Sequence, residues 1–171
     1  KILSVCPITT HLPLKIIIKK INAKSIGEKV FLINQFYMQN FKFKPRIAVL
    51  GLNPHCESVN KLNEDEKIIK PAINHLKKLG YLISGPYPAD TIFLKENRKK
   101  FNIIVGMYHD QVLGPMKTIF GFDAINITIG LPFIRITPDH GPNYKMFGLN
   151  KSNPDSLIQA FRFLSKYAIK A

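Results

Sequence analysis

The chain has 171 residues, 46% of them hydrophobic, and its 25 Lys and Arg against 11 Asp and Glu give a formal net charge of +14. This length and apolar content predict one compact domain with a sizeable core and exclude a disordered chain. No run of about 18 uncharged apolar residues occurs, and the first seven residues are too short and strand-like for a signal peptide, so we expect a soluble, cytoplasmic protein without a membrane partner.

The positive charge does not by itself predict a nucleic-acid partner. Lysines are dispersed among isoleucine and asparagine along the whole chain, with no arginine-rich stripe and no aromatic RNA-binding signature. We interpret them as a solvated surface that attracts anionic substrates in general. The two cysteines, Cys6 and Cys56, lie in different motifs without C-x-x-C spacing, so no disulfide is expected and Cys56 is interpreted as an incidental neighbour of His55.

Hydrophobic periodicity predicts an alternation of strands and helices in the first half of the chain. The expected elements are a strand over 2–9, a helix opening near Pro13, a helix over 25–41, a strand over 46–52 and a helix over 64–79. Ser25 and Glu28 have the spacing of a capping box, which predicts that the second helix starts at Ser25. Pro71 lies inside the last of these helices and is expected to kink it.

Four strands and a final helix are predicted in the second half. The strands are expected over 82–85, 102–107, 124–129 and 133–137. The final helix is expected to have Asn153 as its N-cap and Pro154 at its first position. Its predicted core positions are Leu157, Ile158, Phe161, Leu164 and Ala168. The alternation favours a three-layer α/β/α fold with a largely parallel sheet and no internal linker.

Three of the five histidines follow predicted strands. His11, His55 and His109 each come after a short apolar run, where functional groups gather beyond the carboxyl ends of parallel strands. Each alone is more often a structural histidine, but three in the same topological place favour a metal site with an open coordination position. Imidazole ligands suit zinc or cobalt. His75 is instead expected on the surface of a helix.

Two aspartates accompany this group. Asp110 directly follows His109, and Asp90 lies in Pro-Ala-Asp-Thr. Both are candidate partners of the metal ligands or proton acceptors. The alternatives, a turn carboxylate for Asp110 and a helix N-cap for Asp90, carry equal weight.

A cationic and polar group consists of Lys117, Asn126 and Arg135. Arg135 lies in the otherwise apolar Leu-Pro-Phe-Ile-Arg-Ile, and an arginine in such a run usually has an anion as its partner. A phosphate matches the planar guanidinium well, and a salt bridge to an aspartate is the equal alternative.

A glycine-bearing segment follows, with Asp-His-Gly-Pro-Asn over 139–143 and then Gly148. Such a loop beside a strand end permits close approach of the backbone to a nucleotide. No G-x-G-x-x-G occurs, so a Rossmann-type nucleotide site is not supported.

Five motifs together resemble the 4-hydroxythreonine-4-phosphate dehydrogenase family, in family order and at family spacing across essentially the whole chain. They are Thr-Thr-His-Leu-Pro-Leu over 9–14, Gly-Leu-Asn-Pro-His over 51–55, Gly-Pro-Tyr-Pro-Ala-Asp-Thr over 85–91, Met-Tyr-His-Asp-Gln over 107–111 and Asn-Ile-Thr-Ile-Gly-Leu-Pro-Phe-Ile-Arg over 126–135. The resemblance implies a fold like that of isocitrate and isopropylmalate dehydrogenases.

The implied activity is the NAD- and divalent-metal-dependent oxidation of 4-phosphooxy-L-threonine to 2-amino-3-oxo-4-phosphooxybutanoate, with zinc, magnesium or cobalt as the metal. This product decarboxylates to 3-amino-2-oxopropyl phosphate, on the route to pyridoxine 5'-phosphate. The resemblance also implies that residues 1–171 are the C-terminal half of such an enzyme, the region of metal binding, substrate binding and dimerisation, with the N-terminal half absent. We therefore expect little or no activity from these residues alone.

The resemblance also implies roles for particular residues. The implied metal ligands, contributed across the interface of a homodimer, are His11, His55 and His109. The implied substrate-binding residues are Lys117, Asn126 and Arg135. The catalytic candidates beside the substrate hydroxyl and the metal are Asp90 and Asp110. The residues implied to contact the adenosine half of NAD are His140, Gly141 and Asn153.

Two positions depart from the family pattern. The segment over 56–60, Cys-Glu-Ser-Val-Asn, replaces small and glycine-rich residues, and Lys145 stands where related nucleotide loops commonly have an aspartate. Two alternatives to the implied activity stay open. One is a paralogue that oxidises another phosphorylated hydroxy acid, such as threonate or erythronate 4-phosphate. The other is a non-catalytic metal- or nucleic-acid-binding protein.

Overall fold

A computed structural model describes residues 3–56, 63–142 and 144–167. Where the sequence predicts one compact domain, the chain divides into two compact units, Lys1–Pro115 and Met116–Ala171. Each unit is built around its own sheet. No helix in the described ranges has the length and apolar character needed to cross a membrane.

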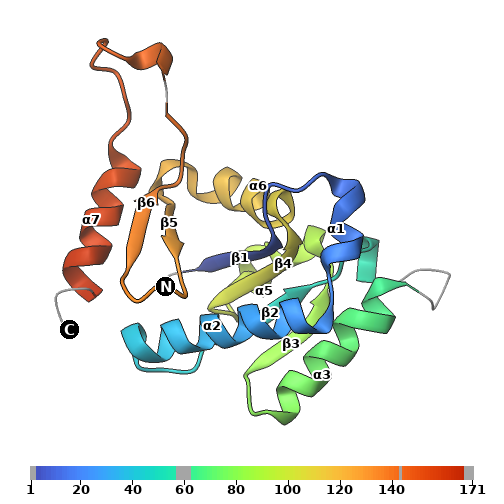
Figure 1. Ribbon diagram of the computed structural model, residues 1–171. Helices are drawn as coiled ribbons and strands as arrows, with labels where there is room; N and C mark the ends of the chain where they lie inside the picture. Colours follow the sequence, from blue (N-terminus) through green and yellow to red (C-terminus); the bar gives the residue numbers. More distant parts are fainter. Residues whose placement is uncertain (1–2, 57–62, 143, 168–171) are drawn as a thin grey trace. The chain divides into compact units, whose positions relative to one another are not determined.

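The first unit contains a four-stranded parallel sheet (Figure 1). Its strands, in spatial order, are β1 (Ser4–Thr9), β4 (Ile103–Tyr108), β2 (Ile47–Leu50) and β3 (Ile83–Tyr87). All four residues of β2 and the first five of β4 are buried. These two strands are continuous apolar runs because both faces of a central parallel strand are covered.

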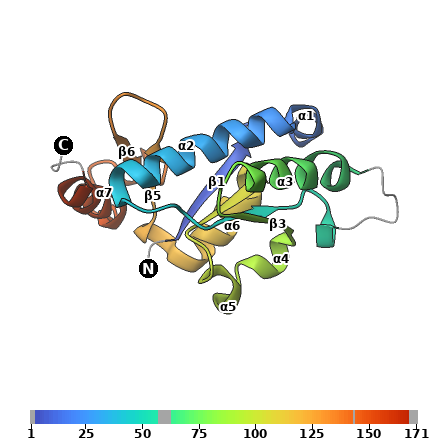
Figure 2. The ribbon, with the colours of Figure 1, turned by 90° about the horizontal axis from the view of Figure 1, so that it is seen from below.

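Helices cover both faces of this sheet. The helices of the first unit are α1 (Leu14–Lys20), α2 (Ala23–Phe41), α3 (Lys70–Lys78), α4 (Ala89–Ile92) and α5 (Lys95–Arg98). Figure 2 shows α2 and α3 on one face and α4 and α5 on the other. The α/β/α layering with a parallel sheet is therefore confirmed for this unit. His75 is exposed on α3, as predicted.

The predicted start of α2 is wrong by two residues, because a different pair of side chains caps it. Asn22 is the N-cap: its side-chain oxygen accepts a hydrogen bond from the Ser25 backbone N–H at 2.8 Å. In return, the Asn22 backbone N–H donates to the Ser25 hydroxyl at 3.2 Å. Ser25 thus takes the reciprocal position that the sequence interpretation gave to Glu28, which instead forms an exposed pair with Lys24 at 3.9 Å.

The segment predicted as one kinked helix over 64–79 consists of two joined helical pieces. A π-helical turn over Asp65–Ile69 leads directly into α3 at Lys70. Pro71 is the second residue of α3 and directly follows the π-helical turn, so the change from π-helical to α-helical geometry comes where its missing N–H cannot donate to the preceding turn. The π turn also contains Asp65, a carboxylate that is fully buried.

The second unit contains an antiparallel two-stranded sheet and one long helix. The strands are β5 (Ile125–Thr128) and β6 (Arg135–Pro138), and the helix is α7 (Asp155–Tyr167). Between the units in sequence, α6 (His109–Phe120) begins directly after β4 and contains the boundary at Pro115. Helix α7 packs against both strands of the small sheet.

Three of the predicted core positions of α7 are wrong, since Leu157, Ile158 and Phe161 are 46%, 40% and 63% exposed. Leu164 is half-buried, and Ala168 lies outside the described residues. The buried residues of this helix are Ser156, Ala160 and Phe163.

The small side chains of Ser156 and Ala160 let α7 approach the two strands closely. The Ser156 hydroxyl donates to the Ala124 carbonyl at 2.6 Å and accepts from the Asp139 N–H at 2.9 Å. These two bonds fix which side of the helix faces the sheet. The Asn153 cap is confirmed, since its side-chain oxygen accepts from the Asp155 N–H at 2.7 Å, although the helix begins at Asp155 and not at Pro154.

Candidate functional site

Three candidate metal ligands lie at one edge of the parallel sheet. Strands β1, β4 and β2 are neighbours and run in the same direction. His11 lies two residues after the end of β1, His109 directly follows β4, and His55 lies in the short helical turn that follows β2. The sequence interpretation of three strand-end histidines therefore matches the topology of the first unit.

The structure brings two of these histidines together. The ring centroids of His11 and His109 are 5.5 Å apart, with their planes inclined by 44°. His55 is exposed at the same sheet edge. Among the residues that the structure describes, no three His, Cys, Asp or Glu side chains are gathered so that one metal ion could be bound by all of them. The chain alone thus brings two imidazoles together in an arrangement open to a divalent cation, and the third histidine follows a neighbouring strand of the same sheet.

Two of the histidines have left-handed backbone conformations, which residues other than glycine rarely adopt. His11 has φ 49° and His55 has φ 58°, and Cys56 after it has φ 56°. Such left-handed residues cost on the order of 1 kcal/mol or more each and persist only where the surrounding structure holds them. They are frequent at ligand sites, so this geometry is consistent with a functional role for both turns.

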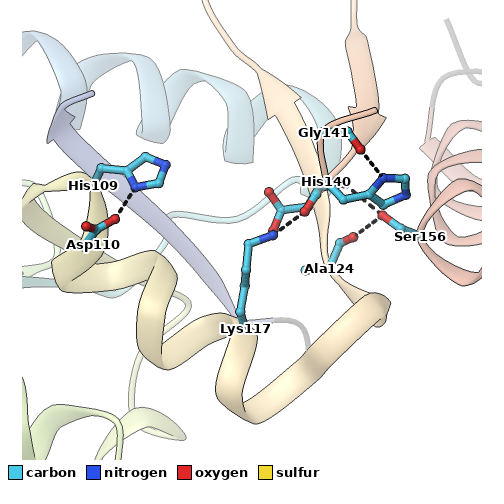
Figure 3. A network of polar contacts seen from close by, with 8 residues as sticks. His109, Asp110, Lys117, Ala124, His140, Gly141 and Ser156 are labelled. Carbon is cyan, nitrogen blue, oxygen red and sulfur yellow. Dashed lines mark hydrogen bonds and ion pairs between the residues drawn. The ribbon is translucent and has the colours of Figure 1, made fainter. Parts of the chain in front are cut away.

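The Asp110 carboxylate lies within hydrogen-bond distance of the His109 ring. The Asp110 carboxylate Oδ1 lies 2.6 Å from His109 Nδ1, while the rest of the Asp110 side chain is exposed (Figure 3). A carboxylate accepting the Nδ1–H leaves the Nε2 lone pair of the imidazole for a ligand. This contact favours the interpretation of Asp110 as a partner of a metal ligand over that of a simple turn carboxylate.

Asp90 is exposed in the first turn of α4, and Pro88 occupies the N-cap position. The N-cap alternative for Asp90 is therefore wrong. Burial raises the pKa of the Cys56 thiol, as do the negative charges of Asp65 and Asp90, while the backbone hydrogen bond to Gly51 and the positive charge of Lys70 lower it.

Cys56 is a buried free cysteine and packs as a small apolar residue. Its interpretation as an incidental neighbour of His55 stays a prediction. The departure from the family pattern over 56–60 falls largely outside the described residues, which exclude 57–62.

The candidate substrate residues lie in the second unit. Lys117, on α6, forms an ion pair with the Asp139 carboxylate at 3.2 Å and also donates to the Asp139 carbonyl (Figure 3). Arg135 donates to the Thr128 hydroxyl at 3.0 Å. Within the described part of the chain, Arg135 is exposed and forms no salt bridge to an aspartate, which was the alternative to a phosphate partner.

The register of the small sheet places Asn126 and Arg135 on the same face. Thr128 lies opposite Arg135, and Asn126 lies opposite Thr137. Because side chains alternate along each strand, these four residues share one side of the β5–β6 pair. The other side carries Ile127 and Ile136, so the sheet has one polar and one apolar face.

The candidate nucleotide residues lie around the end of β6. His140 Nδ1 lies 3.1 Å from the Gly141 carbonyl, and the His140 ring is edge-on to Phe122 with centroids 6.2 Å apart. Asn153 uses its side-chain oxygen as the cap of α7. Asn143 lies outside the described residues, and Lys145 belongs to a short exposed helical turn, Tyr144–Met146.

The sequence interpretation assigned no role to three polar residues at the edge of the sheet that carries the histidines: Thr9, Asp65 and Gln111. All three are buried and hydrogen-bonded to the backbone that carries the histidines. Thr9 and Gln111 belong to the first and fourth motifs, which is the signal that could have found them. Asp65 had no such signal, because an acidic residue near a helix start is usually a solvated one.

The parallel sheet with helices on both faces and functional groups at its carboxyl edge is a dehydrogenase-like α/β fold. The model of the family described as pyridoxal phosphate biosynthetic protein PdxA matches residues 1–164. The chain belongs to this family.

Curated relatives and solved structures agree with this assignment. The chain is 47% identical over 163 residues to 4-hydroxythreonine-4-phosphate dehydrogenase of Sulfurihydrogenibium sp., covering 94% of this chain and 50% of the relative. It is 41% identical to the Bradyrhizobium diazoefficiens protein of the same name, covering 97% and 49%. A solved structure of a putative 4-hydroxythreonine-4-phosphate dehydrogenase from Salmonella typhimurium superimposes with a TM-score of 0.81 at 33% identity, covering 95% and 50%. The chain thus spans about half the length of these relatives.

Proposed function

We propose that the protein containing this chain is an NAD- and divalent-metal-dependent 4-hydroxythreonine-4-phosphate dehydrogenase. It oxidises 4-phosphooxy-L-threonine to 2-amino-3-oxo-4-phosphooxybutanoate, which decarboxylates to 3-amino-2-oxopropyl phosphate in pyridoxine 5'-phosphate biosynthesis. The observation that carries this proposal is the His11–His109 pair at the ends of two adjacent parallel strands, in a chain whose relatives bear that name.

The metal would be held by His11 and His109 together with His55, the set being completed across the interface of a homodimer. When bound, zinc, cobalt or magnesium acidifies the secondary hydroxyl of the substrate, and NAD accepts the hydride. Asp110 keeps the His109 ring oriented through Nδ1. The proton of the hydroxyl passes to Asp90 or to the second carboxylate oxygen of Asp110, since both side chains are exposed.

The substrate phosphate would be bound by residues of the second unit. Arg135 presents an exposed planar guanidinium that donates to the Thr128 hydroxyl. Lys117 already has an anionic partner in Asp139, so a phosphate would share or replace that ion pair. Asn126 lies on the same face as Arg135 and offers an amide donor. Binding energy from this remote group positions the reacting carbon.

The adenosine half of NAD would lie against His140, Gly141 and Asn153. A Cβ added at Gly141 would meet no atom within 4 Å, so the chain's own packing does not require glycine there. Open space above a glycine backbone is what close approach of a nucleotide uses.

The proposal is tested by NADH formation from the full-length protein with three phosphate esters. We expect turnover with 4-phosphooxy-L-threonine and little with threonate 4-phosphate or erythronate 4-phosphate. Unphosphorylated 4-hydroxythreonine is the matched control and should react much more slowly. Turnover with the threonate or erythronate ester alone would replace the proposal by the paralogue. Salt-sensitive nucleic-acid binding without NADH formation from any ester would support the non-catalytic alternative.

A further inference from the structure

Buried polar side chains are concentrated at the edge of the sheet that carries the histidines. In the described ranges, four polar or charged side chains are buried: Thr9 at 7%, Asp65 at 0%, Gln111 at 8% and Ser156 at 1% exposure. The first three lie where β1, β2 and β4 end. Burying a polar group is unfavourable unless it forms hydrogen bonds, so the bonds that these three residues make are decisive.

Thr9 and Gln111 join the ends of all three strands through the backbone. The Thr9 hydroxyl donates to the Met107 carbonyl at 2.8 Å, which links β1 to β4. The Gln111 side-chain oxygen accepts from the Met107 N–H at 2.7 Å, and its amide donates to the Gly51 carbonyl at 2.7 Å, which links β4 to the residue after β2. One glutamine thus connects the strand before His109 with the loop before His55.

Asp65 holds the loop that leads to His55. Its carboxylate accepts from the Leu52 N–H at 2.8 Å, the Asn53 N–H at 3.1 Å and the Asn53 side-chain amide at 2.8 Å. A Cβ at Gly51 would approach Asp65 Oδ1 to 2.8 Å, so the carboxylate lies directly against this backbone. Three donors from two consecutive residues leave the loop little freedom to rotate.

We propose that Thr9, Asp65 and Gln111 act as one polar clamp that positions the three candidate metal ligands. The clamp rests on the proposed function, because it concerns the metal centre of that function. Its members are positioning residues: each bonds to the backbone beside a histidine and none contacts a histidine ring in the bonds described. The left-handed turns at His11 and His55 need surroundings that hold them, and the clamp supplies those surroundings.

A clamp of this kind acts on metal affinity more than on folding. A metal site binds tightly when its ligands are held close to the coordinating geometry before the ion arrives. Removing one link frees one strand end relative to the others, while the sheet itself stays paired. The alternative is that these bonds only stabilise the fold. In that case, replacing any buried polar residue should lower the metal affinity in proportion to the loss of stability, wherever that residue lies.

The test compares Co²⁺ binding with stability in the full-length protein. Gln111→Met keeps the length of the side chain and removes both bonds. Thr9→Val removes the hydroxyl at nearly constant volume, and Thr9→Ser restores it. Ser156→Ala removes two buried backbone bonds in the second unit and is the control for a loss of stability alone. Co²⁺ affinity is measured by titration of the cobalt absorption, and stability by urea unfolding.

We expect Gln111→Met and Thr9→Val to bind Co²⁺ about tenfold more weakly, with altered cobalt spectra, and Thr9→Ser to bind as the wild type does. Ser156→Ala should lose stability and keep its Co²⁺ affinity. An unchanged Co²⁺ affinity in Gln111→Met overturns the clamp. So does a Co²⁺ affinity that falls in proportion to the free energy of unfolding in every variant, including Ser156→Ala. If wild type and His109→Ala bind Co²⁺ equally, the metal centre itself is wrong and the clamp is overturned with it.

Discussion

Replacing Ser156 with alanine should destabilise the second unit strongly for so small a change. The Ser156 hydroxyl is the only atom lost, and it makes two bonds, to the Ala124 carbonyl at 2.6 Å and from the Asp139 N–H at 2.9 Å. Both bonds attach α7 to the chain beside β5 and β6. Their loss therefore weakens the contact on which the helix packs.

The size of the effect follows from the burial of the two partners. Ala124 is 8% exposed, so water has little access to its carbonyl once the Ser156 hydroxyl is gone. Leaving this carbonyl without a hydrogen bond costs about 2 kcal/mol. Asp139 is half-buried, and its N–H can be partly solvated, which costs about 1 kcal/mol. The higher helix propensity of alanine offsets about 0.5 kcal/mol of this loss in the free energy of unfolding. We expect the free energy of unfolding to fall by about 2 to 3 kcal/mol.

The assay is equilibrium unfolding in urea followed by far-UV circular dichroism, since the chain contains no tryptophan. Ser165→Ala is the matched control on the same helix, because Ser165 is exposed and, among the described residues, its hydroxyl donates to the Arg162 carbonyl within the helix itself. We expect this control to change stability by no more than about 0.5 kcal/mol. Equal stabilities of the two variants would refute the role given to the Ser156 bonds.

Three further predictions concern the site and the core. Asp110→Asn should weaken Co²⁺ binding about tenfold, because the amide no longer orients His109 through a charged acceptor; an unchanged titration would contradict this. Arg135→Lys should raise KM for the phosphate ester several-fold with little change in kcat, and a fall in kcat alone would argue against phosphate binding. Desolvation raises the pKa of the half-buried Cys6 thiol from its usual value, although the positive charge of Lys29 opposes this. The protonated thiol stabilises the folded state below the pKa that Cys6 has in the unfolded chain, and this stabilisation is lost as the pH rises through the pKa of the folded state. Cys6→Ala should therefore lessen the fall in the free energy of unfolding at alkaline pH, measured in urea. An equal fall in the variant and the wild type would contradict this.

The strands could be predicted from the sequence because their apolar runs are buried wherever the sheet forms. β2 and β4 lie within the expected ranges or extend one residue beyond them, and the histidines after them lie at the sheet edge. The distance between His11 and His109 could not be predicted, because it depends on β4 lying between β1 and β2. That order is a property of the assembled sheet and leaves no local pattern.

The sequence does not decide which residue takes a structural role when several residues are suited to it. Asn22 and Ser25 are both good caps, and only the chain path before α2 decides that Asn22 takes the position. On α7 the stripe with Leu157 and Phe161 is more apolar than the stripe with Ser156, yet hydrogen bonds of Ser156 turn the latter inward. Asp65 looks like a solvated acid until the β2 loop supplies its three donors.

The central claim is that a histidine-bound divalent cation activates the substrate hydroxyl. It is tested most directly by NADH formation from 4-phosphooxy-L-threonine with the full-length protein before chelation, after chelation and after Co²⁺ is added back. Chelation should abolish turnover, and Co²⁺ should restore it in the wild type but not in His109→Ala. Full turnover after the metal has been removed would show that no bound cation activates the hydroxyl.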